Sequence, residues 1–96
     1  MTEELVTLET AKLLKEKGFN EYYYPTKSIA QKWLRETKNL HITIYNNACG
    51  YGYEISKADN GTHIASSTYK GTNDGGEWDT YKEALEAGIQ EALKLI

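Results

Sequence analysis

The sequence has little cysteine or proline, and it has no long apolar run. Cys49 is the single cysteine among 96 residues, so an internal disulfide is impossible and a disulfide-rich secreted scaffold is excluded. No stretch approaches membrane-spanning length, and the N-terminal MTEELVTLET carries acids where a signal peptide needs basic residues. We therefore expect a cytoplasmic protein with no membrane segment.

Motifs of common enzyme and metal-binding families are also missing. The chain has two histidines and no G-x-S-x-G, Walker-type, H-E-x-x-H or paired-cysteine motif. His41 and His63 lie on different predicted strands and could meet near Glu54, but solvated strand histidines are the favoured interpretation. We predict a protein that is not an enzyme and has no catalytic residue, metal site or cofactor.

Composition is that of a globular protein, at 40% hydrophobic and 26% charged residues. The length suits a single domain over residues 1–96, with residues 1–6 expected to fray. Net charge is −3, divided unevenly: residues 1–39 carry +1 and residues 40–96 carry −4. This is a local basic bias, not the composition of a polyanion-binding protein.

Three helices are predicted from apolar spacing and end signals. The first starts near Thr7 and ends before Gly18, the second opens after Pro25, and the third starts at Thr80. The second has an apolar side and an opposite, basic side that we expect to be solvated. Gly88 lies in the apolar face of the third helix, which predicts close approach to the sheet because glycine is otherwise costly there.

Three strands are predicted between the second and third helices. The run LHITIY alternates apolar and polar residues, YGYEI follows it, and the turn Asp59-Asn60-Gly61 leads into a third strand. A three-residue loop with Gly61 left-handed would pair Ile55 with Ala65 and Tyr53 with Ser67. A two-residue Asn-Gly loop would shift each pairing by one residue. We favour the first register because it keeps apolar groups on one face.

The predicted fold is therefore α+β, in the order α-α-β-β-β-α, with helices packed on one face of a three-stranded antiparallel sheet. The helices cannot cover both faces. The open face should present His41, Thr43, Tyr45 and Glu54 to an unidentified protein partner, and a homodimer could form through this face or an edge strand. We predict a small non-enzymatic protein-interaction module.

The alternative function is that of a DNA-binding accessory protein. The segments ETAKLLKEKGF and TKSIAQKWLRE look like a helix-turn-helix pair followed by a β-hairpin wing. Phosphate contacts would come from the basic side of the second helix, at Lys27, Lys32, Arg35 and Lys38. The long connection between the two helices and the acidic overall charge argue against it, so nucleic acid is the less favoured partner.

Three segments carry a resemblance to a known group: YPTKSIAQKWLRE, LHITIY and TYKEALEAGIQEALKLI. Together they resemble small uncharacterised proteins encoded in phage and prophage-like elements of gut Bacteroidales bacteria, from about Thr7 onward. The resemblance implies a cytoplasmic setting and a mobile-element origin. It implies no activity, cofactor or site residue.

Overall fold

The computed structural model describes residues 5–20, 25–47, 50–67 and 78–96. Its elements are α1 (Leu8–Glu16), α2 (Lys27–Thr37), β1 (Leu40–Asn47), β2 (Gly50–Lys57), β3 (His63–Ser66) and α3 (Tyr81–Lys94). The strands form an antiparallel sheet in the order β1-β2-β3. This confirms the predicted α-α-β-β-β-α fold class.

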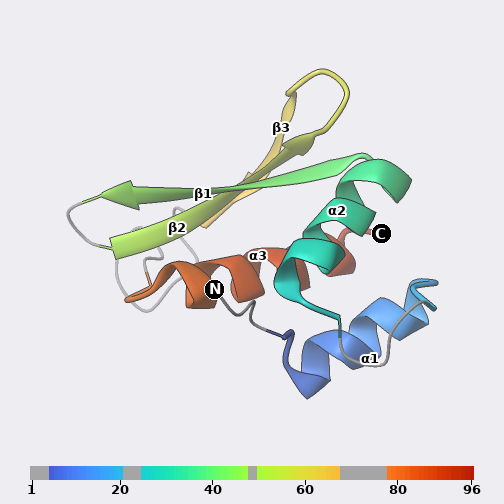
Figure 1. The fold of residues 1–96 in the computed structure, drawn as a ribbon. Coiled ribbons are helices and arrows are strands. Elements are labelled where there is room, and N and C mark those ends of the chain that lie inside the picture. The colour runs from blue at the N-terminus through green and yellow to red at the C-terminus, as the bar shows by residue number, and fades with distance from the viewer. Residues whose placement is uncertain (1–4, 21–24, 48–49, 68–77) are drawn as a thin grey trace.

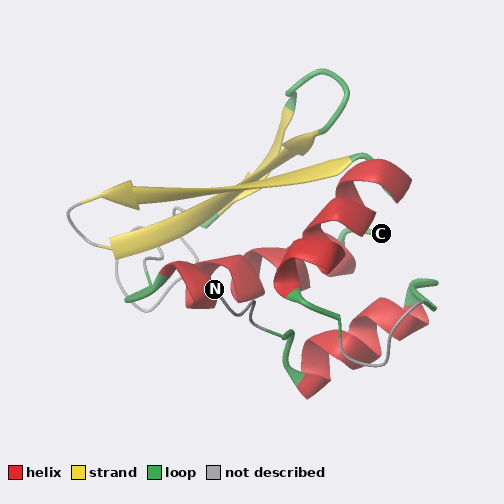
Figure 2. Cartoon of the chain, in the orientation of Figure 1, coloured by secondary structure: helices red, strands yellow, loops and turns green. Residues whose placement is uncertain are grey.

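The described helices lie on one side of the sheet (Figures 1 and 2). Helix α3 packs against β1 and β2, α2 packs against β1, and α1 packs against α3 on the side away from the sheet. The order of layers is thus sheet, then α2 and α3, then α1. The opposite face of the sheet carries no described helix.

Threonine side chains set the start of each helix, and those at Thr7 and Thr80 were predicted. The hydroxyls of Thr7, Thr26 and Thr80 accept hydrogen bonds from the first-turn amides of α1, α2 and α3. At α3 the Glu83 carboxylate also accepts a hydrogen bond from the Thr80 hydroxyl, at 3.0 Å. Helix α1 ends at Glu16, and Gly18 follows it with a φ of +107°, which favours glycine.

The core lies between the helices and the inner face of the sheet. Ile42 and Ile55 form a cross-strand pair that is almost fully buried, and Leu34, Ile89 and Leu93 have no exposed surface. A side chain at Gly88 would place its Cβ 3.0 Å from Ile42 Cγ2 and 3.2 Å from Tyr53 Cβ. The predicted close approach of α3 to the sheet at Gly88 is confirmed.

Trp33 packs against the edge of this core. Its indole meets the Phe19 ring edge to face, with ring centroids 5.6 Å apart, and the Lys38 ammonium lies 5.5 Å from the indole centroid. Phe19 is 2% exposed, so Trp33 covers the joint between the end of α1 and α2. The inward placement of the apolar side of α2 is as predicted.

The β2–β3 hairpin follows the favoured register at its far end and departs from it near the turn. Ile55 pairs with Ala65, and the Ser67 amide donates to the Tyr53 carbonyl, as predicted. A bulge then shifts the register, so that Ser56 pairs with His63. The bulge lengthens the loop beyond three residues: Gly61, at φ +75°, donates to the Lys57 carbonyl.

Two of the residues that we expected to fray, Leu5 and Val6, contact the start of α2. Leu5 forms a bridge with Thr26, and the Val6 amide donates to the Pro25 carbonyl at 3.0 Å. Val6 is 4% exposed because it belongs to the core. Of the residues expected to fray, 1–4 lie outside the described part of the chain.

Candidate functional site

The open face of the sheet is built by alternate residues of β1 and β2. Cross-strand pairing places the predicted interaction residues on this face in the pairs His41–Ser56, Thr43–Glu54 and Tyr45–Gly52. Thr43 and Glu54 are exposed, whereas His41 and Tyr45 are half-buried. The structure therefore brings the four residues that we singled out onto one surface.

Tyr45 is fixed on the open face by its neighbours. A Cβ at Gly52 would lie 2.5 Å from Tyr45 Cζ and from the hydroxyl oxygen, so the ring lies directly over the glycine. The Tyr45 hydroxyl is 3.0 Å from the Ser67 hydroxyl, and Ser67 Oγ accepts from the Tyr53 amide at 2.9 Å. The aromatic ring thus extends across β2 toward Ser67 in one fixed position, and it leans away from the outer edge of β1.

The second feature of the open face is an acid–histidine pair at the β3 side. His63 Nδ1 lies 2.8 Å from Glu54 Oε2, and both side chains are about half exposed. His41 lies on β1, where it pairs with Ser56 of β2, and it is not part of this contact. No group of three metal-ligating side chains occurs within residues 5–20, 25–47, 50–67 and 78–96. A solvated pair of this kind is worth little in stability.

The backbone directions along β2 show which of its residues bond to β1 and which bond on the β3 side. The backbone groups of Tyr51, Tyr53 and Lys57 bond on the β3 side of β2. The intervening residues Gly52, Glu54 and Ser56 therefore point their backbone groups at β1, because N–H and C=O directions alternate along a strand. Their partners on β1 are Tyr45, Thr43 and His41.

The remaining residues of β1 point their backbone groups outward, away from the sheet. One of them is already capped: the Gln31 side-chain amide of α2 donates to the Ile42 carbonyl at 2.8 Å. Further along β1, the outward groups of Ile44 and Asn46 have no partner on that side among the described residues. The edge is thus covered by α2 at its start, and no other described residue covers it toward its end.

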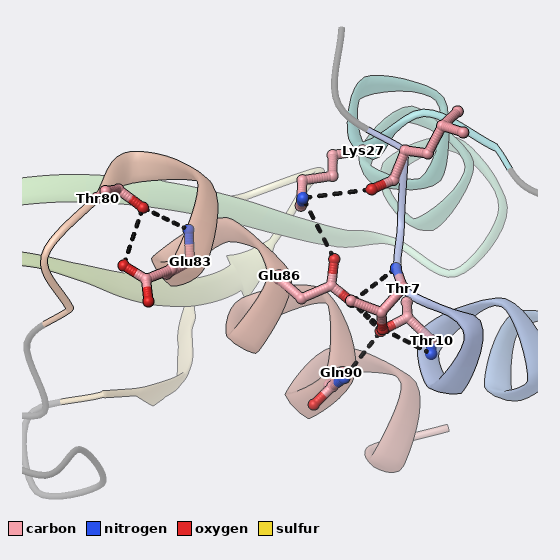
Figure 3. Close-up of polar contacts among 8 residues, drawn as sticks. Thr7, Thr10, Lys27, Thr80, Glu83, Glu86 and Gln90 are labelled. Carbon is pink, nitrogen blue, oxygen red and sulfur yellow. Dashed lines mark hydrogen bonds and ion pairs between the residues drawn. The ribbon is translucent and has the colours of Figure 1, made fainter.

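A separate polar cluster joins the starts of α1 and α2 to the middle of α3 (Figure 3). Glu86 Oε2 accepts from the Thr7 amide at 3.3 Å, from the Thr7 hydroxyl at 2.8 Å and from the Thr10 hydroxyl. Gln90 donates to Thr10 Oγ1 at 2.9 Å. The Glu86 carboxylate thus lies at the N-terminus of α1, where the helix dipole favours negative charge.

Lys27 belongs to this cluster, which corrects the expectation that it lies on a solvated basic face. Its ammonium is 3.5 Å from Glu86 Oε1 and donates to the Leu5 carbonyl at 3.4 Å. The Lys27 and Glu86 side chains are only 10% and 13% exposed. Its burial follows from the position of the first turn of α2, which packs onto α3 where Glu86 supplies a compensating charge.

The other predicted phosphate-binding residues have varied settings. Lys32 is exposed, whereas Arg35 and Lys38 are half-buried and the Lys38 ammonium lies over the Trp33 ring. Gln31, which shares the basic side of the helical projection, is bonded to β1. The basic side of α2 is therefore interrupted by contacts to α3 and the sheet.

An open groove of about 500 Å³ runs along α3 beside the polar cluster. Its lining includes Thr7, Lys27, Lys82, Glu86 and Gln90. The carboxylate and ammonium in its wall are already paired with each other, and the Thr7 and Thr80 hydroxyls in its lining act as helix caps that donate to Glu86 and Glu83. We therefore assign no chemical activity to this groove.

Sequence reasoning missed Gly52, Ser67 and Gln31 as parts of the site. Gly52 could have been found, because a glycine opposite an aromatic residue in a hairpin leaves space for the ring to lie across the partner strand. Finding it requires the β1–β2 register, which a connection of two residues between Asn47 and Gly50 sets. No local pattern marks Ser67 or Gln31, since their partners are distant in sequence.

Comparison of the chain with protein-family models, curated proteins and solved structures finds no match. Within the described part of the chain, no helix combines the length and the apolar character needed to cross a membrane.

Proposed function

We propose that the protein is a small, non-enzymatic interaction module that binds a partner protein through the open face of its sheet. The observation that carries this proposal is the fixed, half-buried Tyr45 ring on a sheet face without a described helix. A preorganised aromatic side chain loses little conformational entropy on binding, and aromatic residues are enriched at protein interfaces. Thr43 and Glu54 flank it as exposed polar contacts.

The setting that we propose is the cytoplasm of a gut Bacteroidales bacterium, with a mobile-element origin. The resemblance carried by the segments of α2, β1 and α3 supports this proposal. A lysate of such a bacterium is therefore the material in which we look for the partner protein.

The test compares capture from this lysate by two immobilised double variants. Thr43→Arg with Glu54→Arg changes the exposed residues of the open face, whereas Lys12→Glu with Lys94→Glu changes exposed residues of α1 and α3. We expect the wild-type protein and the helix variant to retain the same protein after nuclease treatment, and the open-face variant to lose it. Equal retention by both variants would count against the open face.

DNA binding by α2 is the second proposed function, supported by the exposed Lys32 and the nearby Arg35. Phosphate contacts release counterions, so duplex binding should weaken steeply between about 50 and about 200 mM salt. It should also be lost in a Lys32→Glu, Arg35→Glu variant. A protein that captures only nucleic acid from the lysate would favour this function over the first.

A further inference from the structure

We propose that the outer edge of β1 pairs antiparallel with β1 of a second copy of the chain, on a two-fold axis at Tyr45. The pairing would join the two sheets into one continuous sheet. It uses backbone groups at the edge and not side chains of the open face, so it does not rest on the proposed function.

The choice of edge follows from a contrast between β1 and β3. Natural sheets protect their edges with short strands, bulges or charged residues. β3 has four residues and a bulge in its pairing with β2. β1 has eight residues, LHITIYNN, with no Lys, Arg, Asp, Glu or Pro. It carries none of these protections beyond the single cap from Gln31.

The absence of charge on β1 argues for a second copy as the partner. When two copies of β1 pair, each side chain of one copy lies opposite a side chain of the same strand in the other copy. Like charges opposite each other would be destabilising. An antiparallel pair of β1 strands sets no formal charges against each other. The Tyr45 ring does not obstruct the approach, because it lies across β2 over Gly52.

Gln31 selects the register of the pairing. An axis at Ile44 would require the Asn46 amide of the second copy to bond the Ile42 carbonyl, which already accepts from Gln31. An axis at Tyr45 instead sets Ile44 opposite Asn46 of the second copy. The outward N–H and C=O groups of both residues are then satisfied, and Ile42 keeps its cap.

The position of α2 is compatible with this arrangement. Helix α2 lies beside the start of β1 and leaves its far end clear (Figure 1). A two-fold axis near the far end puts the two α2 helices at opposite ends of the paired strands, where they do not meet. The isologous interface repeats the same contacts in both copies, so the assembly closes as a dimer.

The test measures mass against concentration in Asn46→Pro and Asn46→Ala variants. Proline removes the outward amide of Asn46, which β2 does not use, while alanine removes only the exposed side chain. From about 10 µM to about 1 mM, we expect the wild type and Asn46→Ala to approach twice the 10.9 kDa monomer mass in sedimentation equilibrium. Asn46→Pro should associate at least about tenfold more weakly.

Amide hydrogen exchange in the wild-type protein gives a second measurement that needs no variant. Exchange at Ile44 and Asn46 should slow as concentration rises, while exchange at Thr43 and Tyr45 should not depend on concentration. A chain that stays monomeric throughout, or a dimer equally strong in Asn46→Pro with unchanged exchange at Ile44, would overturn the pairing.

Discussion

Tyr53 shows how one buried polar group couples stability to pH. Its ring packs between Trp78, at a centroid distance of 5.7 Å, and the backbone of α3 at Gly88. Burial, with a further contribution from the nearby Glu91 carboxylate, raises the pKa of the Tyr53 hydroxyl from 10.0 to about 12. The folded protein therefore holds this proton more tightly than the unfolded chain does.

The sign of the pH effect follows from linkage. Above about pH 10 the unfolded chain releases the Tyr53 proton while the folded protein retains it, so the free energy of unfolding falls until about pH 12. Below about pH 10 both states keep this proton, so the group adds no pH dependence to the free energy of unfolding. We expect Tyr53→Phe to lose stability less steeply than the wild type in that range, measured by urea unfolding at each pH. Parallel curves for the two proteins would contradict the raised pKa.

Gly52 is the residue on which the proposed binding face depends. Alanine at this position would place Cβ 2.5 Å from the Tyr45 ring and 2.7 Å from Ser67 Oγ, so the ring must swing off the strand. We expect Gly52→Ala to cost about 1–3 kcal/mol of unfolding free energy. In a Tyr45→Ala background this cost should fall, because the ring is absent and only the contact with Ser67 Oγ remains. An equal cost in both backgrounds, measured by denaturant unfolding, would mean that the Tyr45 ring contributes nothing to the clash at Gly52.

At the scale of elements, α2 carries two lysines in opposite environments: Lys27 is buried and Lys32 is exposed. Lys27→Met leaves the Glu86 carboxylate buried without its ion-pair partner, and we expect a loss of roughly 2–4 kcal/mol in unfolding free energy. Lys32→Met changes an exposed side chain and should stay within about 0.5 kcal/mol of the wild type. Chemical denaturation of the two variants measures the difference. Similar values would mean that the Lys27–Glu86 contact contributes nothing.

Helices and strands were predictable because their signals are local. The Thr7, Thr26 and Thr80 caps and the stop at Gly18 lie next to the helices that they bound. The alternation in β1 also identified which face is buried, since Ile42 lies in the core and Thr43 on the open face. These signals were sufficient to predict the element order and the packing of helices on one face of the sheet.

The environment of Lys27 was not predictable, because a helical projection shows only which residues share a side. Whether that side meets water depends on where α2 packs, and its partner Glu86 lies 59 positions later in the sequence. The bulge in β3 was missed for a related reason. The signal in Asp59-Asn60-Gly61 specifies a turn, but several loop lengths satisfy it and packing of the strands selects among them.

For the whole molecule, the helices cover one face of the sheet, and the other face is the one that we propose binds a partner. Helices α2 and α3 bury one face of β1 and β2, and α1 is held to α3 partly by the Glu86 cluster. Stability therefore comes from the covered side. Substitutions on the open face, such as Thr43→Arg, should change binding with little effect on folding.

The backbone directions in β1 make a prediction that covers the whole arrangement of layers. In β1, Thr43 and Tyr45 point their amides at β2, whereas Ile44 and Asn46 point theirs outward. At concentrations where sedimentation reports a monomer, the amides of Thr43 and Tyr45 should exchange with solvent at least about tenfold more slowly than those of Ile44 and Asn46. Amide exchange followed by nuclear magnetic resonance measures each site. Uniformly slow exchange along β1 would mean that another segment covers its outer edge, and the opposite alternation would mean that β1 pairs with β2 in a different register.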